Sequence, residues 1–142
     1  MAQTGMECVE ILKGVVKETK PDFLITVDAL AARSIRRLGR TIQLTDTGIT
    51  PGSGIGNHRN AINRKSVGVP VISLGVPTVV DARTLCADLS GAEIDLPEDT
   101  ELFVTPRDID TRVRDSARLV GYAIDLALHD ALTIEDIDMF LA

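Results

Sequence analysis

The sequence predicts an α/β fold, a three-layer α/β/α arrangement around a mainly parallel sheet. Apolar, β-branched runs of strand length alternate along the chain with segments of helical spacing. The run at 23–27 is almost free of polar residues, which is typical of a strand buried on both faces of a parallel sheet. The length of 142 residues is that of one ordinary domain. We therefore expect residues 1–142 to form a single α/β domain.

The first half of the chain opens on a predicted helix. Residues 4–7 (Thr-Gly-Met-Glu) have capping-box spacing, in which both side chains bond to free backbone N–H groups. The Lys-Pro pair at 20–21 ends this helix, because proline disfavours helical conformation in the residue before it. The strand at 23–27 then ends at Asp28. The segment 29–38 is rich in Ala, Leu and Arg and favours a helix.

The second half repeats the alternation. A short strand at 41–44 and a glycine-rich loop at 46–60 lead into it. Its elements are a strand at 69–74, a turn at 75–77, a helix that follows 78–81 and runs through 89, a connection at 90–100, a strand at 102–104, a long helix that starts at 105–108 and reaches 127, and a short helix capped at 133.

Composition excludes several classes of function. Fifteen basic against 21 acidic residues give a formal net charge of −6, which disfavours general binding to nucleic acids or anionic membranes. No run of apolar residues has the length of about 18 that a membrane span needs. Two cysteines, Cys8 and Cys86, are too few for a disulfide framework or a zinc site. We expect no nucleic acid, membrane, metal or cofactor as a partner, and a reducing cytoplasm as the location.

Asp28 is the main catalytic candidate. Ligands in α/β sheets meet the loops at the carboxyl ends of strands, and Asp28 follows the strand 23–27. A carboxylate at the end of a buried strand is partly desolvated, which suits acid–base chemistry. Asp28 could equally cap the predicted helix 29–38, and both roles can hold together.

The loop 46–60 is the candidate binding cleft. Its glycines permit positive φ and close approach of a peptide backbone, and no Gly-Lys-Ser/Thr follows them as in a phosphate loop. Residues 46–48 (Asp-Thr-Gly) match the pepsin motif, but that chemistry needs two copies and the chain is not all-β. A loop without a catalytic role is the alternative. The candidate cleft-lining residues are Asp46, Ser53, Gly54, Asn57 and His58.

Four arginines have the spacing of one helix face: Arg33, Arg36, Arg37 and Arg40. On an acidic protein such a basic stripe is most simply a solvated face or a subunit contact. Contact with an acidic substrate is the alternative interpretation.

Three long stretches, at 21–34, 46–57 and 68–82, together resemble the germination protease family of spore-forming bacteria. Residues 1–7 and 104–129 are similar to that family as well. The resemblance implies an atypical aspartic endopeptidase that degrades small acid-soluble spore proteins during germination in the spore core. It also implies a zymogen, a homo-oligomer that is usually a tetramer, and the phosphorylase/hydrolase-like fold of hydrogenase-maturation proteases.

The resemblance covers only part of such a protease. Asp28 matches one of the family's two essential aspartates, and the other belongs to an upstream segment that has no match here. Relatives also carry a longer insertion between Cys86 and Leu102. We therefore expect a C-terminal half that is inactive without its N-terminal half and whose strand 23–27 lacks one neighbour. The alternatives are a non-catalytic scaffold fragment and a metal-dependent maturation-type peptidase in which Asp28 and His58 share an ion.

Overall fold

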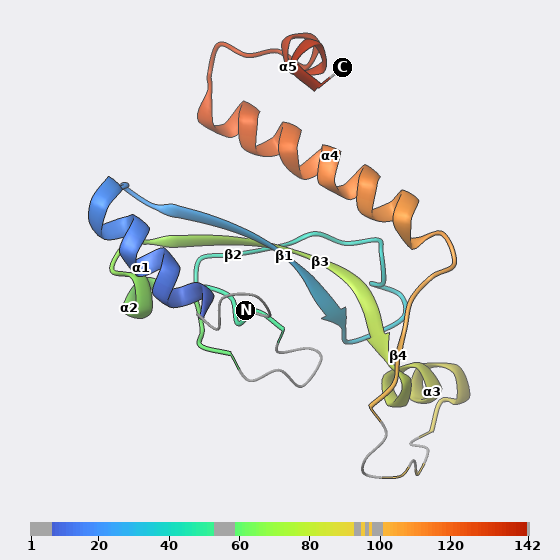
Figure 1. Cartoon of the computed structure of the whole chain (residues 1–142). Helices are drawn as coiled ribbons and strands as arrows, with labels where there is room; N and C mark the ends of the chain where they lie inside the picture. The colour runs from blue at the N-terminus through green and yellow to red at the C-terminus, as the bar shows by residue number, and fades with distance from the viewer. Residues whose placement is uncertain (1–6, 53–58, 93–94, 96, 98–100, 142) are drawn as a thin grey trace. The chain divides into compact units, whose positions relative to one another are not determined.

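The computed structural model describes residues 7–52, 59–92, 95, 97 and 101–141 (Figure 1). The chain divides into two compact units, one up to Pro106 and one from Arg107 onward, and each is described by itself. No helix in these described ranges is long and apolar enough to cross a membrane.

Helix α1 (Cys8–Thr19) begins the first unit. Glu7 and Glu10 form a reciprocal capping box, so the predicted helix start is found three residues later than expected. Thr4, the expected cap, lies outside the described residues. Lys20 ends the helix in the left-handed conformation, with φ of 47°, immediately before Pro21.

Strand β1 (Leu24–Ala32) is longer than predicted, and the expected helix at 29–38 is wrong. Residues 29–32 continue the strand and pair with β3 (Val71–Asp81), and residues 33–40 form bends and turns. Helix propensity favours Ala or Leu by only a few tenths of a kcal/mol per residue, so pairing along a long neighbouring strand outweighs it.

The sheet is mixed, with β3 at its centre. Its strand order is β1-β3-β2, and β4 (Phe103–Val104) pairs with the far end of β3. The parallel pairing of β1 with β3 is the longest, while β2 (Gln43–Thr45) and β4 are antiparallel to β3. In the described part of the chain β1 has one strand neighbour, so it is the edge strand that was expected.

The predicted turn at 75–77 is wrong, because these residues lie inside β3. The register nevertheless shifts there: Leu30 is opposite Pro77 and Ala31 is opposite Val79, which leaves Thr78 without a counterpart. Proline has no N–H to give to the ladder, and such a position is typical of a bulge.

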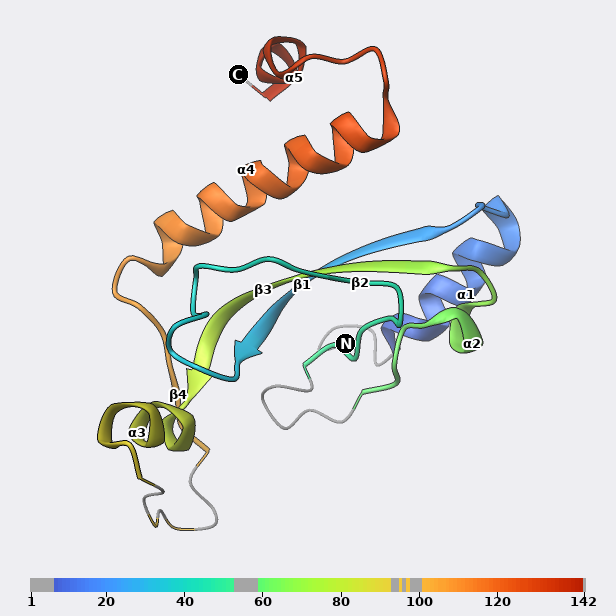
Figure 2. The ribbon, with the colours of Figure 1, turned by 180° about the vertical axis from the view of Figure 1, so that it is seen from behind.

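The two faces of the sheet differ. Val71 belongs to a core cluster with residues of α1, of α2 (Arg64–Val67) and of the loop between β2 and α2: Val9, Val67 and Ile62. Helices α1 and α2 therefore lie on the Val71 face, as Figures 1 and 2 show from opposite sides. On the opposite face Val27, Leu44 and Ile72 are 55%, 70% and 37% exposed, so the burial of both faces expected for 23–27 is not found.

Helix α3 (Ala82–Ser90) follows β3 directly, as predicted. The Asp81 carboxylate accepts hydrogen bonds from the backbone N–H groups of Arg83 at 2.8 Å and Thr84 at 3.4 Å and so caps the helix. The helix ends at Gly91, which is left-handed with φ of 71°. The short helix α2, in contrast, was not predicted, because its four residues are too few for a periodic pattern.

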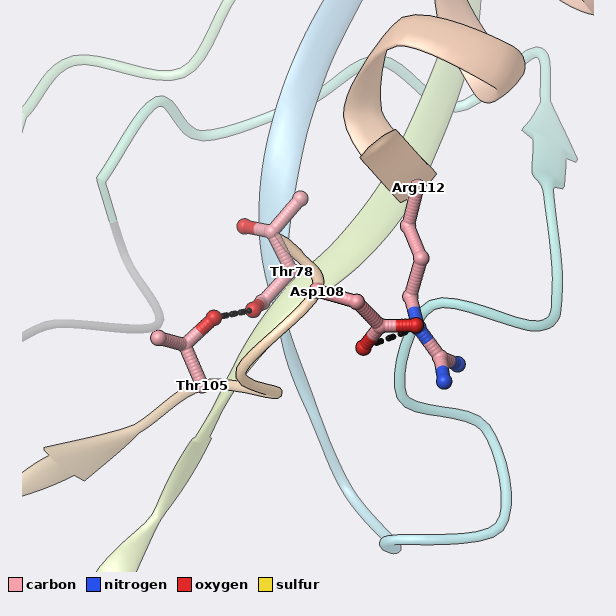
Figure 3. A network of polar contacts seen from close by, with 4 residues as sticks. All are labelled: Thr78, Thr105, Asp108 and Arg112. Carbon is pink, nitrogen blue, oxygen red and sulfur yellow. Dashed lines mark hydrogen bonds and ion pairs between the residues drawn. The ribbon is translucent and has the colours of Figure 1, made fainter. Parts of the chain in front are cut away.

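The second unit contains α4 (Ile109–Leu128) and α5 (Ile134–Leu141). Helix α4 starts later than predicted, with Asp108 as its first flanking residue, whose carboxylate pairs with Arg112 at 2.9 Å (Figure 3). Thr105, the expected cap, belongs to the first unit and donates its hydroxyl hydrogen bond to the Thr78 carbonyl (Figure 3). The helix runs to Leu128, one residue beyond the predicted extent, and His129 flanks its end.

Candidate active site

Asp28 lies in the interior of β1, opposite Gly75 of β3. One carboxylate oxygen, Oδ1, accepts the N–H of Ala29 at 2.9 Å. The other, Oδ2, is buried and has no hydrogen-bond partner among the residues that the structure describes. A buried carboxylate oxygen without a partner is costly, and a catalytic role is one of the reasons for which proteins keep such a group. The helix-cap interpretation of Asp28 is wrong, because residues 29–32 are strand.

Gly75 makes room beside this carboxylate. A Cβ atom at Gly75 would lie 2.7 Å from Cγ of Leu30 and would overlap its Cδ1. Leu30 is two residues beyond Asp28 on the same strand, so the two side chains lie on the same face of β1. The leucine therefore fills the space over Gly75, next to Asp28 in the sheet.

Two hydroxyl side chains lie two residues before Asp28 and Gly75 along their strands. Thr26 of β1 donates a hydrogen bond to Oγ of Ser73 at 2.8 Å, and Ser73 is only 1% exposed. Thr26 and Ser73 are opposite each other in the ladder, just as Asp28 and Gly75 are. The face of the sheet that carries Asp28 is thus polar and buried at its centre. Sequence reasoning missed this pair, because a single hydroxyl residue in each of two apolar runs does not show that the two lie opposite each other.

A pocket with a volume of about 690 Å³ begins one residue beyond Asp28. Its walls come from the end of β1, the turn segment after it, β2, the start of the glycine-rich loop, the end of β3 and the start of α3: Ala29, Leu30, Ala31, Ala32, Arg33, Arg37, Gln43, Thr50, Gly52, Asp81 and Thr84. Ligand pockets in proteins typically measure about 300–1,000 Å³. The catalytic candidate and a cavity of ligand size are therefore consecutive along β1.

Asp46, the other described acidic candidate, lies apart from Asp28. It is exposed and follows β2 directly, whose Thr45 is opposite Ser73. Two strand spacings and about three residues along the strands separate the two aspartates, so their Cα atoms are roughly 14 Å apart. Two carboxylates that share a proton must be about 3 Å apart, so Asp46 cannot be the acidic partner of Asp28. Nor is it among the described residues that line the pocket.

The base of the glycine-rich loop is tightly closed. Ile49 and Ile62 exchange backbone hydrogen bonds of 2.9 and 2.7 Å. Gly48 has φ of 91°, and a Cβ there would lie 2.6 Å from Cβ of Asn63, so this position requires glycine. The other cleft-lining candidates, Ser53, Gly54, Asn57 and His58, lie outside the described residues.

The expected basic stripe on a helix is wrong, because residues 33–40 are not helical. Because the segment is not a helix, the four arginines do not form one helix face. Two of them, Arg33 and Arg37, line the pocket. The segment is held by Asp88 of α3, whose carboxylate accepts the Ile35 N–H at 2.7 Å and the Ser34 hydroxyl at 2.8 Å. These hydrogen bonds hold the pKa of Asp88 below its usual value.

Comparison with known proteins identifies the family. The model of the germination protease family, a peptidase family, matches residues 1–95 of this chain. The chain belongs to the germination protease family. Germination proteases of Clostridium perfringens strain SM101 and Caldanaerobacter subterraneus are 38% and 41% identical to it over 170 aligned positions that cover 97% of the chain. That of Bacillus velezensis is 57% identical over 88 residues, which are 62% of the chain and 24% of the relative.

The chain matches only part of each of these relatives. The chain spans about half, 52%, of the Clostridium and Caldanaerobacter germination proteases. The 170 aligned positions also exceed the chain's own 142 residues, so these relatives carry extra residues inside the matched region. The family resemblance inferred from the sequence is confirmed, and so is the expectation that the chain corresponds to part of a longer germination protease.

Proposed function

We propose that this chain is the C-terminal part of an aspartic-type endopeptidase and that Asp28 is one of its two catalytic carboxylates. The observation that carries the proposal is the buried Oδ2 of Asp28, which has no hydrogen-bond partner among the described residues and belongs to the residue just before Ala29 of the pocket wall. Membership of the germination protease family supports the reaction class.

The chemistry assigns Asp28 one of two proton-transfer roles. Peptide hydrolysis needs one group that takes a proton from water and another that protonates the leaving amine. Among the described residues, Oδ2 has no hydrogen-bond donor that would compete with a water or a substrate. The family resemblance implies that the second carboxylate lies in an upstream segment that has no match in this chain, and the distance of Asp46 from Asp28 agrees with that.

The same proposal extends to the finer features of the family. The substrates are small acid-soluble spore proteins, and the place of action is the spore core. The complete enzyme is made as a zymogen and assembles as a homo-oligomer. The completed domain is a single three-layer α/β/α unit, in which the free edge of β1 gains a neighbour from the missing half.

The test compares the chain alone with a reassembled protease. The chain is purified alone and also together with the portion of the Caldanaerobacter germination protease that it does not match. Cleavage of a small acid-soluble spore protein is then followed by mass spectrometry. We expect no cleavage by the chain alone and specific cleavage by the assembled pair.

Two outcomes contradict this proposal. Strong cleavage by the isolated chain would show that it holds a complete catalytic pair. An assembled complex that binds the spore protein but leaves it intact would favour a non-catalytic scaffold.

A further inference from the structure

Ser73 is a buried hydroxyl group whose own hydrogen has no acceptor among the described residues. Thr26 donates its hydroxyl hydrogen to Oγ of Ser73 at 2.8 Å, and Ser73 is only 1% exposed. Each hydroxyl carries one hydrogen, so this bond uses the hydrogen of Thr26 and leaves that of Ser73 for another acceptor. A buried donor that goes unused is costly, so the surroundings of Ser73 decide what it binds.

The neighbours of Ser73 on its face of the sheet leave one buried acceptor open. Thr45 of β2 is opposite Ser73, but its hydroxyl bonds to that of Thr47 at 2.8 Å and also accepts the Thr47 N–H. Gln43 of the same strand is exposed and meets solvent. Asp28 of β1 has the buried Oδ2 that no described donor reaches. An unused donor and an unused acceptor therefore lie diagonally across β1 and β3.

The spacing of these two groups fits one water between them. Asp28 and Ser73 are one strand apart and two residues apart along the strands, so their Cα atoms are roughly 8 Å apart. Oδ2 and the Ser73 hydroxyl make no direct hydrogen bond. Two hydrogen bonds of about 2.8 Å each, made through one water, join oxygens that are up to about 5.6 Å apart. A single bridging water thus satisfies both groups.

We propose that Ser73 holds the water that Asp28 activates, and that Thr26 is the positioning residue that orients the Ser73 hydroxyl. The inference rests on the proposed function, because this water is the nucleophile only if Asp28 is a catalytic carboxylate. Ser73 donates to the water oxygen, and the water donates one hydrogen to Oδ2. As the water oxygen bonds to the peptide carbonyl carbon, Oδ2 takes that proton and the carbonyl π electrons move to the carbonyl oxygen.

Thr26 fixes the direction in which Ser73 donates. A free serine hydroxyl rotates to suit its surroundings, whereas the bond from Thr26 occupies one lone pair of Oγ and turns the serine hydrogen away from β1's threonine. Threonine branches at Cβ, so its own rotamer is restricted. A donor that is oriented before the substrate arrives needs no reorganisation during the reaction.

The first experiment does not depend on cleavage. Crystal structures of the chain and of its Ser73→Ala variant are determined at a resolution that shows ordered waters. We expect one water within hydrogen-bond distance of both Asp28 Oδ2 and Ser73 Oγ, and its loss in Ser73→Ala. A direct bond between Ser73 and Asp28, the lack of a water between them, or a water that stays in place in Ser73→Ala would each overturn the inference.

The second experiment measures kcat and KM of the reassembled protease on a small acid-soluble spore protein. Ser73→Ala should lower kcat about tenfold and leave KM unchanged, because one hydrogen bond to the nucleophile is lost. Thr26→Val should lower kcat by a smaller factor, and Thr26→Ser should restore it. Thr45→Val is the matched control: it removes a hydroxyl beside Ser73 that makes no bond to it, and it should keep the original kcat.

The two proposals fail in different ways. An unchanged kcat in Ser73→Ala, or an equal loss in Thr45→Val, would overturn the role of Ser73 and leave the proposed function intact. No cleavage by the original pair would contradict the proposed function and with it the use of the water in catalysis. The crystal structures would in that case still decide whether Ser73 and Asp28 share a water.

Discussion

Asp28 of β1 lies opposite Gly75 of β3, the one glycine of the central strand. Because Gly75 has no side chain, Leu30 fills the space above it. Leu30 and Asp28 lie on the same face of β1. The proposed catalytic carboxylate of Asp28, the pocket-lining Ala29 and the apolar Leu30 are thereby consecutive on one strand.

Gly75→Ala is predicted to destabilise the first unit. The added methyl would overlap Leu30, so the leucine must leave its place or the strands must shift, at a cost of about 1–3 kcal/mol. Urea unfolding followed by circular dichroism measures this cost. Gly14→Ala is the control, because nothing lies within 4 Å of a Cβ at that position in α1. It should stabilise the protein by about 0.5–1 kcal/mol, and an equal effect of the two substitutions would refute the steric explanation.

Thr105→Val is predicted to weaken the connection between β3 and the segment after β4. The Thr105 hydroxyl donates a hydrogen bond of 2.8 Å to the carbonyl of Thr78, the bulged residue that has no partner in the ladder. Its loss should lower the free energy of unfolding by about 1 kcal/mol. Thr105→Ser keeps the hydroxyl and should remain close to the original stability. Equal stabilities of the Val and Ser variants would show that the bond contributes nothing.

Asp88 is predicted to stabilise the arginine segment in a pH-dependent way. Hydrogen bonds from the Ile35 N–H and the Ser34 hydroxyl lower the pKa of Asp88 in the folded state. A lowered folded pKa means that the stabilisation is fully present above the ordinary value of 3.8 and is lost as the pH falls through the folded value.

The check is a comparison of the original chain with Asp88→Asn across this pH range. At pH 7 the variant should show faster amide exchange at Ile35, and the difference should vanish at a pH below the folded pKa of Asp88. A difference that persists unchanged in acid would mean that the carboxylate charge is irrelevant.

The fold was predictable where local signals agree with the pairing of strands. Helices α3 and α5 follow their capping residues, whereas α1 and α4 both start a few residues later than predicted. The helix predicted at 29–38 was wrong because residues 29–32 pair with β3, a strand more than 40 positions away in sequence. The turn predicted at 75–77 was wrong for a similar reason. Gly and Pro indicate a turn locally, but here they lie inside β3, where a bulge accommodates them.

The candidate site was predictable in part. Asp28 was singled out because it follows an apolar run at the expected end of a strand. The structure places it inside β1, one residue before the first residue of the pocket wall. The Thr26–Ser73 pair and the arrangement of Arg33 and Arg37 depend on the register between β1 and β3 and on the anchoring of the turn segment. No pattern within either segment alone contains that information.

The central claim is that Asp28 supplies one of the two catalytic carboxylates. The most direct measurement is the cleavage rate of the reassembled protease with Asp28→Asn, against Asp46→Asn as the control carboxylate. We predict that Asp28→Asn lowers the rate by about 10²–10⁴-fold while the protein stays folded, and that Asp46→Asn keeps most of the activity. Cleavage at the original rate by Asp28→Asn would contradict the claim.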